Sequence, residues 1–242
     1  MKTMPLICGN HLLAALSPET ADRLFPHLER VDLKLGEVVY ETGESLRYVY
    51  FPINCIVSLL YVMENGASAE ISVVGNEGLF STALLLGGDS STSRAVVQSA
   101  GVAYRVKGQK LREEFHRHGE LLYLILRYTQ ALITQTAQTA VCNRHHTIDQ
   151  QLCRWLLLSL DRLPDSHLTM TQELIANMLG VRREGVTEAA GKLQRLGIID
   201  YSRGHINVRD RAGLERLSCE CYAVVKRQTD VLLAWPLPGQ AR

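Results

Sequence analysis

Several features are scarce in this 242-residue sequence, and each scarcity excludes a class of protein. No apolar run approaches the roughly 18 residues that a membrane-spanning helix requires, so we expect no membrane association. The first nineteen residues hold one lysine and a broken apolar run, which makes a poor signal peptide and predicts a cytoplasmic protein. The six cysteines are irregularly spaced in a long chain, which argues against a disulfide framework.

Net charge and catalytic motifs are equally sparse. The formal net charge is only +1, so the chain as a whole is no general binder of polyanions, and any affinity for nucleic acid must be local. The sequence contains no nucleophile elbow, phosphate-binding loop or zinc-protease signature, and no candidate acid–base pair. We therefore expect no enzyme activity, no catalytic residues and no cofactor.

The middle of the chain lacks the two residues that break helices. No proline falls between Pro52 and Pro164, and no glycine between Gly119 and Gly180. Residues 111–160 are therefore predicted to be helical, with a broad apolar stripe followed by a polar run at 134–139. We expect the stripe to form a coiled-coil-like seam between two copies of the chain, with plain core packing as the alternative. The candidate dimerisation residues are Leu121, Leu122, Ile125, Tyr128 and Leu132.

Residues 168–208 carry the clearest pattern, which is a helix, a tight turn, a second helix and a small β-wing. Thr169 or Thr171 can cap the first helix, and Thr169 with Gln172 has capping-box spacing. Gly180 stands where a left-handed residue ends that helix. Gly197 ends the second helix, and two short strands follow it. This order predicts a winged helix-turn-helix.

The second helix of such a motif enters the major groove of DNA and reads bases with its first residues. Here the start of the helix is basic, and Arg can pair with guanine while Glu can accept from cytosine. Gly185 is expected to let the helix approach the DNA backbone closely. A helical hairpin with a merely solvated charged face is the alternative. The candidate DNA-binding residues are Thr171, Gln172, Arg182, Arg183, Glu184, Thr187, Glu188, Arg203 and His205.

The charge of this region is modest. Residues 178–218 contain eight Arg or Lys and five Asp or Glu, a balance of +3 before His205 is counted. A dimer would double this basic surface.

The same segment resembles the DNA-binding domain of the Crp/Fnr regulators. In that family the first helix begins with a Thr, here Thr171, and the recognition helix begins with an Arg-Glu pair, here Arg183-Glu184. The position four residues further on is usually Arg but is Glu188 here, which implies a different target sequence. The resemblance implies a dimeric transcription regulator that binds a pseudo-palindromic operator in double-stranded DNA, with RNA polymerase as a candidate further partner.

The first half of the chain changes to a period of two. Short alternating strands follow one another from Val31, and Glu64-Asn65-Gly66 is a hairpin turn signal. Residues 30–107 resemble the double-stranded β-helix, or jelly roll, of the cyclic nucleotide-binding fold, through Leu33-x-x-Gly36-Glu37 and Gly43-Glu44. The fold class expected is therefore α+β, with this β domain, a long dimerisation helix and a winged helix-turn-helix.

The resemblance also bears on the effector. Nucleotide-binding members have a Gly-Glu pair that opens a phosphate cassette and an Arg followed by a small residue that ends it. This sequence has Glu77-Gly78 in the reverse order, and Arg94-Ala95 comes after extra residues. These four are the candidate effector-binding residues, but the altered cassette predicts independence from cyclic AMP and leaves the effector unknown. The alternative function is a small-molecule or redox sensing module in which DNA binding is secondary.

Two pairs of residues raise the question of a metal. His145 and His146 have no carboxylate or cysteine at metal-binding spacing. Cys219 and Cys221 are expected on one helix that runs from Asp210 to Lys226, where residues two apart point about 200° apart. One ion could not readily bind both thiolates, so we expect no metal site, and a redox role for the pair stays open.

These patterns divide the chain into four parts. We expect a sensor-like β domain at 1–112, a dimerisation helix at 113–145, a winged helix-turn-helix domain at 146–222, and the end of a helix with a tail at 223–242.

Overall fold

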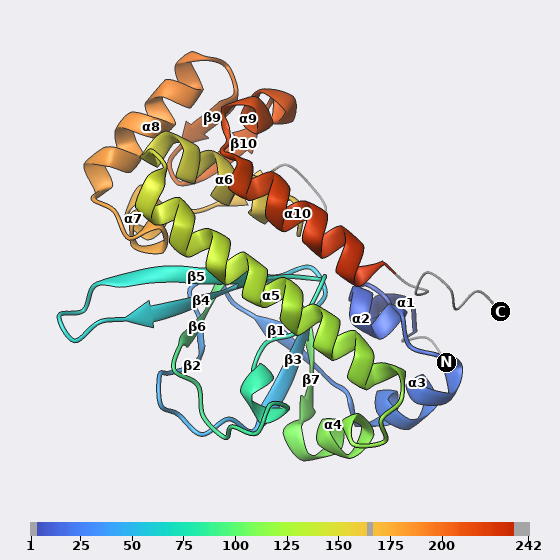
Figure 1. The fold of residues 1–242 in the computed structure, drawn as a ribbon. Coiled ribbons are helices and arrows are strands. Elements are labelled where there is room, and N and C mark those ends of the chain that lie inside the picture. Colours follow the sequence, from blue (N-terminus) through green and yellow to red (C-terminus); the bar gives the residue numbers. More distant parts are fainter. Residues whose placement is uncertain (1–3, 164–166, 235–242) are drawn as a thin grey trace.

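The computed structural model describes residues 4–163 and 167–234 (Figure 1). A β domain, a long helix and a winged domain follow one another, so the predicted α+β class is confirmed. The tail predicted from Trp235 lies outside the described residues.

From residue 4 onward, three short helices precede the β domain. They are α1 (Met4–Ile7), α2 (His11–Ala14) and α3 (Pro18–Leu24), followed by the single 3-10 turn η1 (Phe25–His27). Ser17 caps α3, because its hydroxyl accepts a hydrogen bond from the Thr20 amide and Pro18 occupies the first turn.

The β domain consists of two antiparallel sheets. Its strands are β1 (Glu29–Leu33), β2 (Val38–Tyr40), β3 (Tyr48–Pro52), β4 (Ile56–Val62), β5 (Ser68–Val74), β6 (Arg94–Ser99) and β7 (Gly101–Lys107), with a 3-10 turn, η2 (Thr82–Leu84), before β6. One sheet has the order β1-β7-β3 and the other β2-β6-β4-β5. The predicted turn between β4 and β5 is confirmed, with Gly66 at φ +82°. Phe51, Phe80 and Val97 are fully buried in the core of this domain.

Two helices follow the sheets where one was predicted. They are α4 (Gly108–Phe115) and α5 (Glu120–His145), and His118 at φ +58° separates them. Helix α5 crosses the whole β domain (Figure 1).

The orientation of α5 corrects the prediction of the dimer seam. Leu121, Ile125 and Tyr128 are buried in the core of their own β domain, so they are not available to a second chain. Leu132 is half-buried and packs against the same core, and Leu122 is half-buried. The prediction failed because an apolar helical stripe has the same spacing whether it covers the β domain of its own chain or packs against a second chain. Here the β sandwich needs an apolar cover, and α5 supplies it.

The carboxyl-terminal part is the winged domain. Its elements are α6 (Ile148–Leu160), β8 (His167–Thr169), α7 (Gln172–Leu179), α8 (Arg183–Arg195), β9 (Ile199–Ser202), β10 (His205–Val208), α9 (Arg211–Leu217) and α10 (Glu220–Leu233). The wing is a three-stranded sheet of order β8-β10-β9, and its strand β8 was not predicted. The single last helix predicted over Asp210–Lys226 is wrong, because the chain breaks at Ser218-Cys219 and α10 continues to Leu233 along α5 (Figure 1).

The winged domain packs directly on the β domain. Ile56, Leu60 and Val73 of the β2-β6-β4-β5 sheet share one apolar core with Leu156 of α6 and Met178 of α7. This sheet is therefore covered on both faces, by the β1-β7-β3 sheet on one side and by the winged domain on the other.

A buried polar chain crosses the same contact. Gln98 donates from Nε2 to the Ser159 hydroxyl of α6 at 2.8 Å, and the Ser58 hydroxyl lies 2.8 Å from Gln98 Oε1 and 2.5 Å from Glu70 Oε2. Burial raises the pKa of Glu70 to about 7. A hydroxyl has one proton to donate. If Glu70 is protonated, it can donate to the Ser58 hydroxyl, and Ser58 can then donate its own proton to Gln98. Every hydrogen bond in this buried network then has one donor and one acceptor.

Within the described residues, no helix combines the length and the apolar composition that crossing a bilayer would require.

Candidate nucleic-acid interface

The first helix of the motif, α7, has both ends fixed by local geometry. The Thr171 hydroxyl accepts from the Leu174 amide at 3.3 Å and caps the helix. Thr169 lies in β8, so the capping box proposed for Thr169 and Gln172 is wrong. Gly180 ends the helix at φ +66°, as predicted.

The second helix, α8, presents its first turns to solvent. Val186, Ala189 and Leu193 are buried on its inner face. The predicted reading residues Arg182, Arg183, Glu184, Thr187 and Glu188 are all exposed. The structure thus brings these five together at one accessible helix start.

Polar contacts hold α8 against its neighbours. The Thr187 hydroxyl donates to Gln172 Oε1 of α7 at 2.7 Å, and Lys192 forms an ion pair with Asp149 of α6. A Cβ at Gly185 would lie 2.7 Å from Ile148 of α6. The expectation that Gly185 serves close approach to DNA is therefore corrected, because its missing side chain makes room for α6.

The wing ends in a two-residue turn. Ser202 pairs with His205, and Arg203 and Gly204 between them both have positive φ, +50° and +82°, as in a type I′ turn. Arg203 is exposed at this tip. His205 is exposed too, and its ring stacks on that of His167 at a centroid distance of 5.4 Å.

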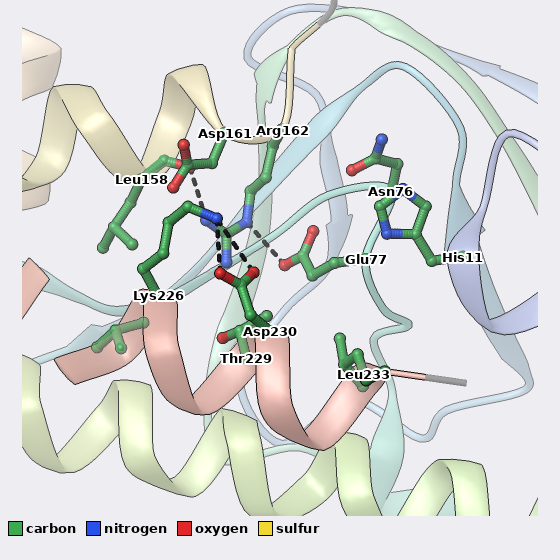
Figure 2. A pocket seen from close by; sticks show the side chains of 12 residues that line it. His11, Asn76, Glu77, Leu158, Asp161, Arg162, Lys226, Thr229, Asp230 and Leu233 are labelled. Atoms are coloured by element: carbon green, nitrogen blue, oxygen red, sulfur yellow. Dashed lines mark hydrogen bonds and ion pairs between the residues drawn. The ribbon is translucent and has the colours of Figure 1, made fainter. Parts of the chain in front are cut away.

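Glu77, a candidate effector-binding residue, forms an ion pair with Arg162 of the winged domain. Arg162, which follows α6, donates from Nε to Glu77 Oε1 at 2.7 Å (Figure 2). The Gly75 amide donates to Glu77 Oε2 at 3.0 Å. Both side chains of the pair are nearly inaccessible, at 6% and 11% exposure. Arg162 also donates to the carbonyl of Leu158 and to Gln135 of α5.

The other three cassette residues have their own structural roles. A Cβ at Gly78 would lie 2.0 Å from the ring of Tyr128, whose hydroxyl donates to the Leu79 carbonyl at 2.7 Å. Arg94 binds both carboxylate oxygens of Glu41, at 2.7 and 2.8 Å, and holds the pKa of Glu41 below its usual value. Ala95 is fully buried. Each residue of the predicted cassette is thus used inside the fold.

A cavity of about 290 Å³ lies where the domains meet, beside the Glu77–Arg162 pair (Figure 2). His11 of α2 and Asn76 of the β domain line it on one side, and Lys226 and Asp230 of α10 line it on the other. Sequence reasoning missed this junction, because Glu77 and Arg162 are 85 positions apart and no local pattern links them.

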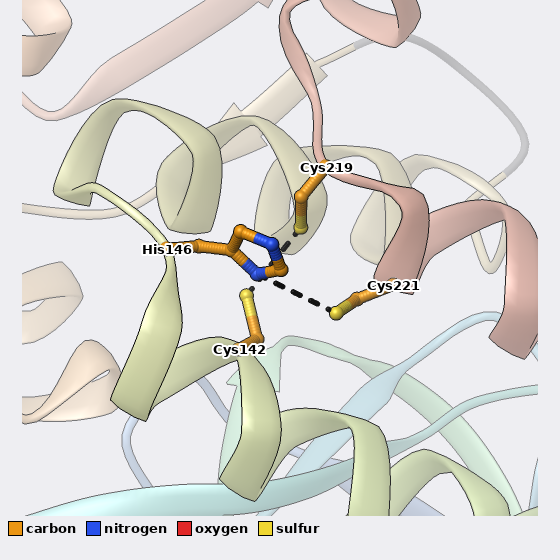
Figure 3. A group of neighbouring side chains, drawn as sticks. All are labelled: Cys142, His146, Cys219 and Cys221. Carbon is orange, nitrogen blue, oxygen red and sulfur yellow. Dashed lines mark hydrogen bonds between the residues drawn. The ribbon is translucent and has the colours of Figure 1, made fainter.

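The structure also brings together four side chains that sequence reasoning kept apart. Cys142 and His146 at the end of α5 meet Cys219 and Cys221 at the start of α10 (Figure 3). Cys219 and Cys221 do not share a helix as predicted, because Cys219 is the extended N-cap residue of α10, at φ −84° and ψ 165°. Their two thiols can therefore face the same point.

Comparison with protein families matches both halves of the chain. Residues 30–118 match the cyclic nucleotide-binding domain, and residues 150–217 match the Crp-like helix-turn-helix domain. Comparison with curated protein sequences finds no significant match.

Solved structures share the overall fold at low sequence identity. FixK2 from Bradyrhizobium japonicum has a TM-score of 0.66 at 18% identity, with 79% of this chain and 98% of that chain covered. A CRP-family transcriptional regulator from Thermus thermophilus has a TM-score of 0.65 at 20% identity, covering 78% and 96%. The c-di-GMP responsive global regulator CLP of Xanthomonas campestris has a TM-score of 0.64 at 15% identity, covering 80% and 100%.

The likeness in structure shows the fold, and the two domain matches carry the family. A cyclic nucleotide-binding domain, a long helix and a Crp-like helix-turn-helix follow one another on this chain in that order. The chain therefore belongs to the Crp/Fnr-type helix-turn-helix transcription regulators.

Proposed function

We propose that the protein binds a pseudo-palindromic DNA operator as a homodimer, and that it does so without cyclic AMP. The observation that carries the proposal is the exposed start of α8, where Arg182, Arg183 and Glu184 stand on a helix fixed by its neighbours. Rigid support matters, because base readout requires each side chain to meet one base edge in a defined geometry.

The residues at this start divide into distinct roles. Arg183 is proposed to pair bidentately with a guanine, and Glu184 to accept from a cytosine nearby. Glu188 lies one turn further along the same exposed face, where it either accepts from cytosine or orients an arginine. Arg203, at the tip of the wing, is proposed to contact a phosphate, which supplies affinity without sequence preference.

The dimer is proposed to form through the solvent-facing side of α5. Tyr123, Leu126, Gln130, Ile133 and Ala137 are all exposed and follow one another at spacings of three and four. This is the spacing of the a and d positions of a coiled coil. More than 40% of Tyr123, Leu126 and Ile133 is exposed, which leaves an apolar strip opposite the buried face. A two-fold axis along this strip would place two copies of α8 on half-sites about one helical turn apart.

Independence from cyclic AMP follows from where the cassette residues are used. For Glu77 to bind a ribose hydroxyl it would have to leave Arg162, a buried cation that would then lack its partner. Arg94 would likewise have to leave Glu41 before it could bind a phosphate. Both costs oppose nucleotide binding.

Enrichment of random double-stranded DNA on the purified full-length protein tests the proposal. Without any nucleotide added, we expect selection of a sequence with two-fold symmetry. Recovery of unrelated sequences with no shared half-site would overturn the proposal, whatever the affinity.

A further inference from the structure

Four potential metal ligands meet at the joint between the long helix and the last helix. The thiol sulfurs of Cys142, Cys219 and Cys221 and a ring nitrogen of His146 all lie within 4.8 Å of one another (Figure 3). The three cysteines are buried, and the imidazole is only 14% exposed. The sequence brings them from two segments more than 70 residues apart.

Local backbone geometry explains how they converge. Cys142 lies in the last turn of α5, and His146 is the C-cap residue directly after the helix. The His146 amide still donates to the Cys142 carbonyl at 3.0 Å, which keeps the two residues one above the other at the helix end. Cys219 precedes α10 as its extended N-cap residue, and Cys221 lies in the first turn. The break between α9 and α10 thereby turns two thiols toward the end of α5.

The spacing of the ligand atoms fits a single tetrahedral ion. With Zn–S near 2.3 Å and Zn–N near 2.0–2.1 Å, the edges of the tetrahedron are about 3.8 Å between two sulfurs and about 3.6 Å between sulfur and nitrogen. In the structure Cys142 Sγ lies 3.5 Å from Cys219 Sγ, and Cys221 Sγ lies 3.6 Å from His146 Nδ1. An iron–sulfur cluster distributes its ligands over several irons and would need them farther apart.

The histidine is held in the orientation that a metal ligand requires. Its Nε2 lies 3.3 Å from the carboxylate of Glu220, which leaves Nδ1 facing the thiols. A carboxylate on the far ring nitrogen is the usual arrangement behind a metal-binding histidine, because it fixes the tautomer and the ring plane.

A buried cation beside the cluster supplies independent support. Arg154 of α6 is 3% exposed, its Nη1 donates to the Thr139 hydroxyl at 3.1 Å, and its Nε has no hydrogen-bond partner. Within the described residues it forms no ion pair, and the acidic side chain whose charge it acts on is the buried Glu70. Because burial raises the pKa of Glu70 to about 7 and favours its protonated form, Glu70 does not fully neutralise this guanidinium, and an uncompensated buried charge is costly. Three thiolates around a divalent ion carry a net charge of −1, which would balance this guanidinium.

We propose that Cys142, His146, Cys219 and Cys221 bind one zinc ion. All four positions of the tetrahedron come from the protein, so the site is a closed structural one with no place for a substrate. Each cysteine loses its proton to solvent when the ion binds. The ion would tie the end of α5 to the start of α10 and so fix the winged domain on the long helix.

This proposal goes beyond the DNA-binding function, and its test needs no DNA. Metal-free full-length protein, reduced and kept free of air, is titrated with Co²⁺ as a spectroscopic probe for zinc. We expect one equivalent to bind, with the intense visible bands and the near-ultraviolet charge-transfer band of tetrahedral thiolate coordination. Added zinc should abolish both.

Variants then assign the ligands. Replacing Cys142, Cys219 or Cys221 singly by Ser should remove the tetrahedral spectrum, whereas Cys8→Ser, at an exposed thiol, and Cys55→Ala, at a buried one, should keep it. His146→Ala should weaken binding, and His146→Cys should restore it, which separates ligation from misfolding. Glu220→Gln should lower the affinity about 10- to 100-fold, as for loss of a group that orients a ligand.

Three results would overturn the proposal. The first is the absence of a thiolate spectrum in the reduced wild-type protein. The second is an unchanged spectrum after Cys142→Ser. The third is a Cys142–Cys219 disulfide in protein purified without exposure to air, since that bond would use two of the four ligands.

Discussion

The two domains of this regulator share a family fold with their relatives but use their polar side chains in opposite ways. In the winged domain Arg183, Glu184 and Glu188 point to solvent from the start of α8. In the β domain Glu77 and Arg94 are held by Arg162 and Glu41. One domain therefore leaves its charges accessible at the surface, while the other uses them to hold the protein together. A fold can therefore persist when the residues at the position of a family binding site form structural contacts.

The largest expected effect concerns the proposed dimer, because the proposed operator binding by the winged domain requires two copies of the chain. Replacing Leu126 and Ile133 together by Lys places two charges on the exposed strip of α5. We expect monomers in sedimentation, and a fall in operator affinity toward the non-specific level, about 1,000-fold or more. Leu35→Lys is the control, since Leu35 is equally exposed but lies outside the strip and should leave both unchanged. A dimeric double variant would show that the seam lies elsewhere.

The next effect separates the buried ion pair from the exposed one. Glu77→Ala leaves Arg162 buried without its carboxylate, and we expect a loss of about 3–5 kcal/mol in the free energy of unfolding. Glu41→Ala breaks the exposed pair with Arg94 and should cost less than about 1 kcal/mol. Urea unfolding followed by tryptophan fluorescence measures both. Equal costs for the two variants would contradict the assignment of Glu77 to a structural role.

A third effect tests the docking of the two domains through pH. The pKa of Glu70 is raised from 4.5 to about 7 by burial, so its folded form holds a proton that the unfolded form releases earlier. Stability is therefore highest below the unfolded pKa and falls between about pH 4.5 and 7, by up to about 3 kcal/mol. Glu70→Gln keeps a neutral hydrogen-bonding group and should remove this fall. A wild-type protein whose stability rises over this range, or a variant with the same profile, would refute a neutral Glu70.

The smallest expected effect is a null result. Calorimetric titration with cyclic AMP should give no binding heat, because both charged residues of the cassette are already paired. Binding in the low micromolar range that Arg94→Ala abolishes would restore the cassette as an effector site.

The winged domain could be predicted because its signals are local. The cap at Thr171, the left-handed Gly180 and the basic start of α8 each depend on residues within a few positions. The alternation of the β strands is local in the same sense.

The remaining features depend on contacts between distant segments. The apolar stripe of α5 does not reveal which side of the helix the β domain covers. Ile125 was therefore predicted to contact a second chain, whereas it is buried in the core of its own β domain. Nothing local connects Glu77 with Arg162. The cysteine cluster was missed because one residue, Cys219, lies before its helix and not in it.

One measurement tests the central claim, which is that α8 reads bases and the wing holds phosphate. DNA enrichment is carried out in parallel with the wild type, Arg183→Ala and Arg203→Ala, and the affinity of each is measured against salt. We predict that Arg183→Ala costs about 1–3 kcal/mol per half-site and relaxes the preference at one base pair. Arg203→Ala should keep the selected sequence and lower the salt slope by about one for each phosphate that the wing no longer binds. If both variants select the wild-type sequence with equal salt slopes, α8 does not lie in the groove.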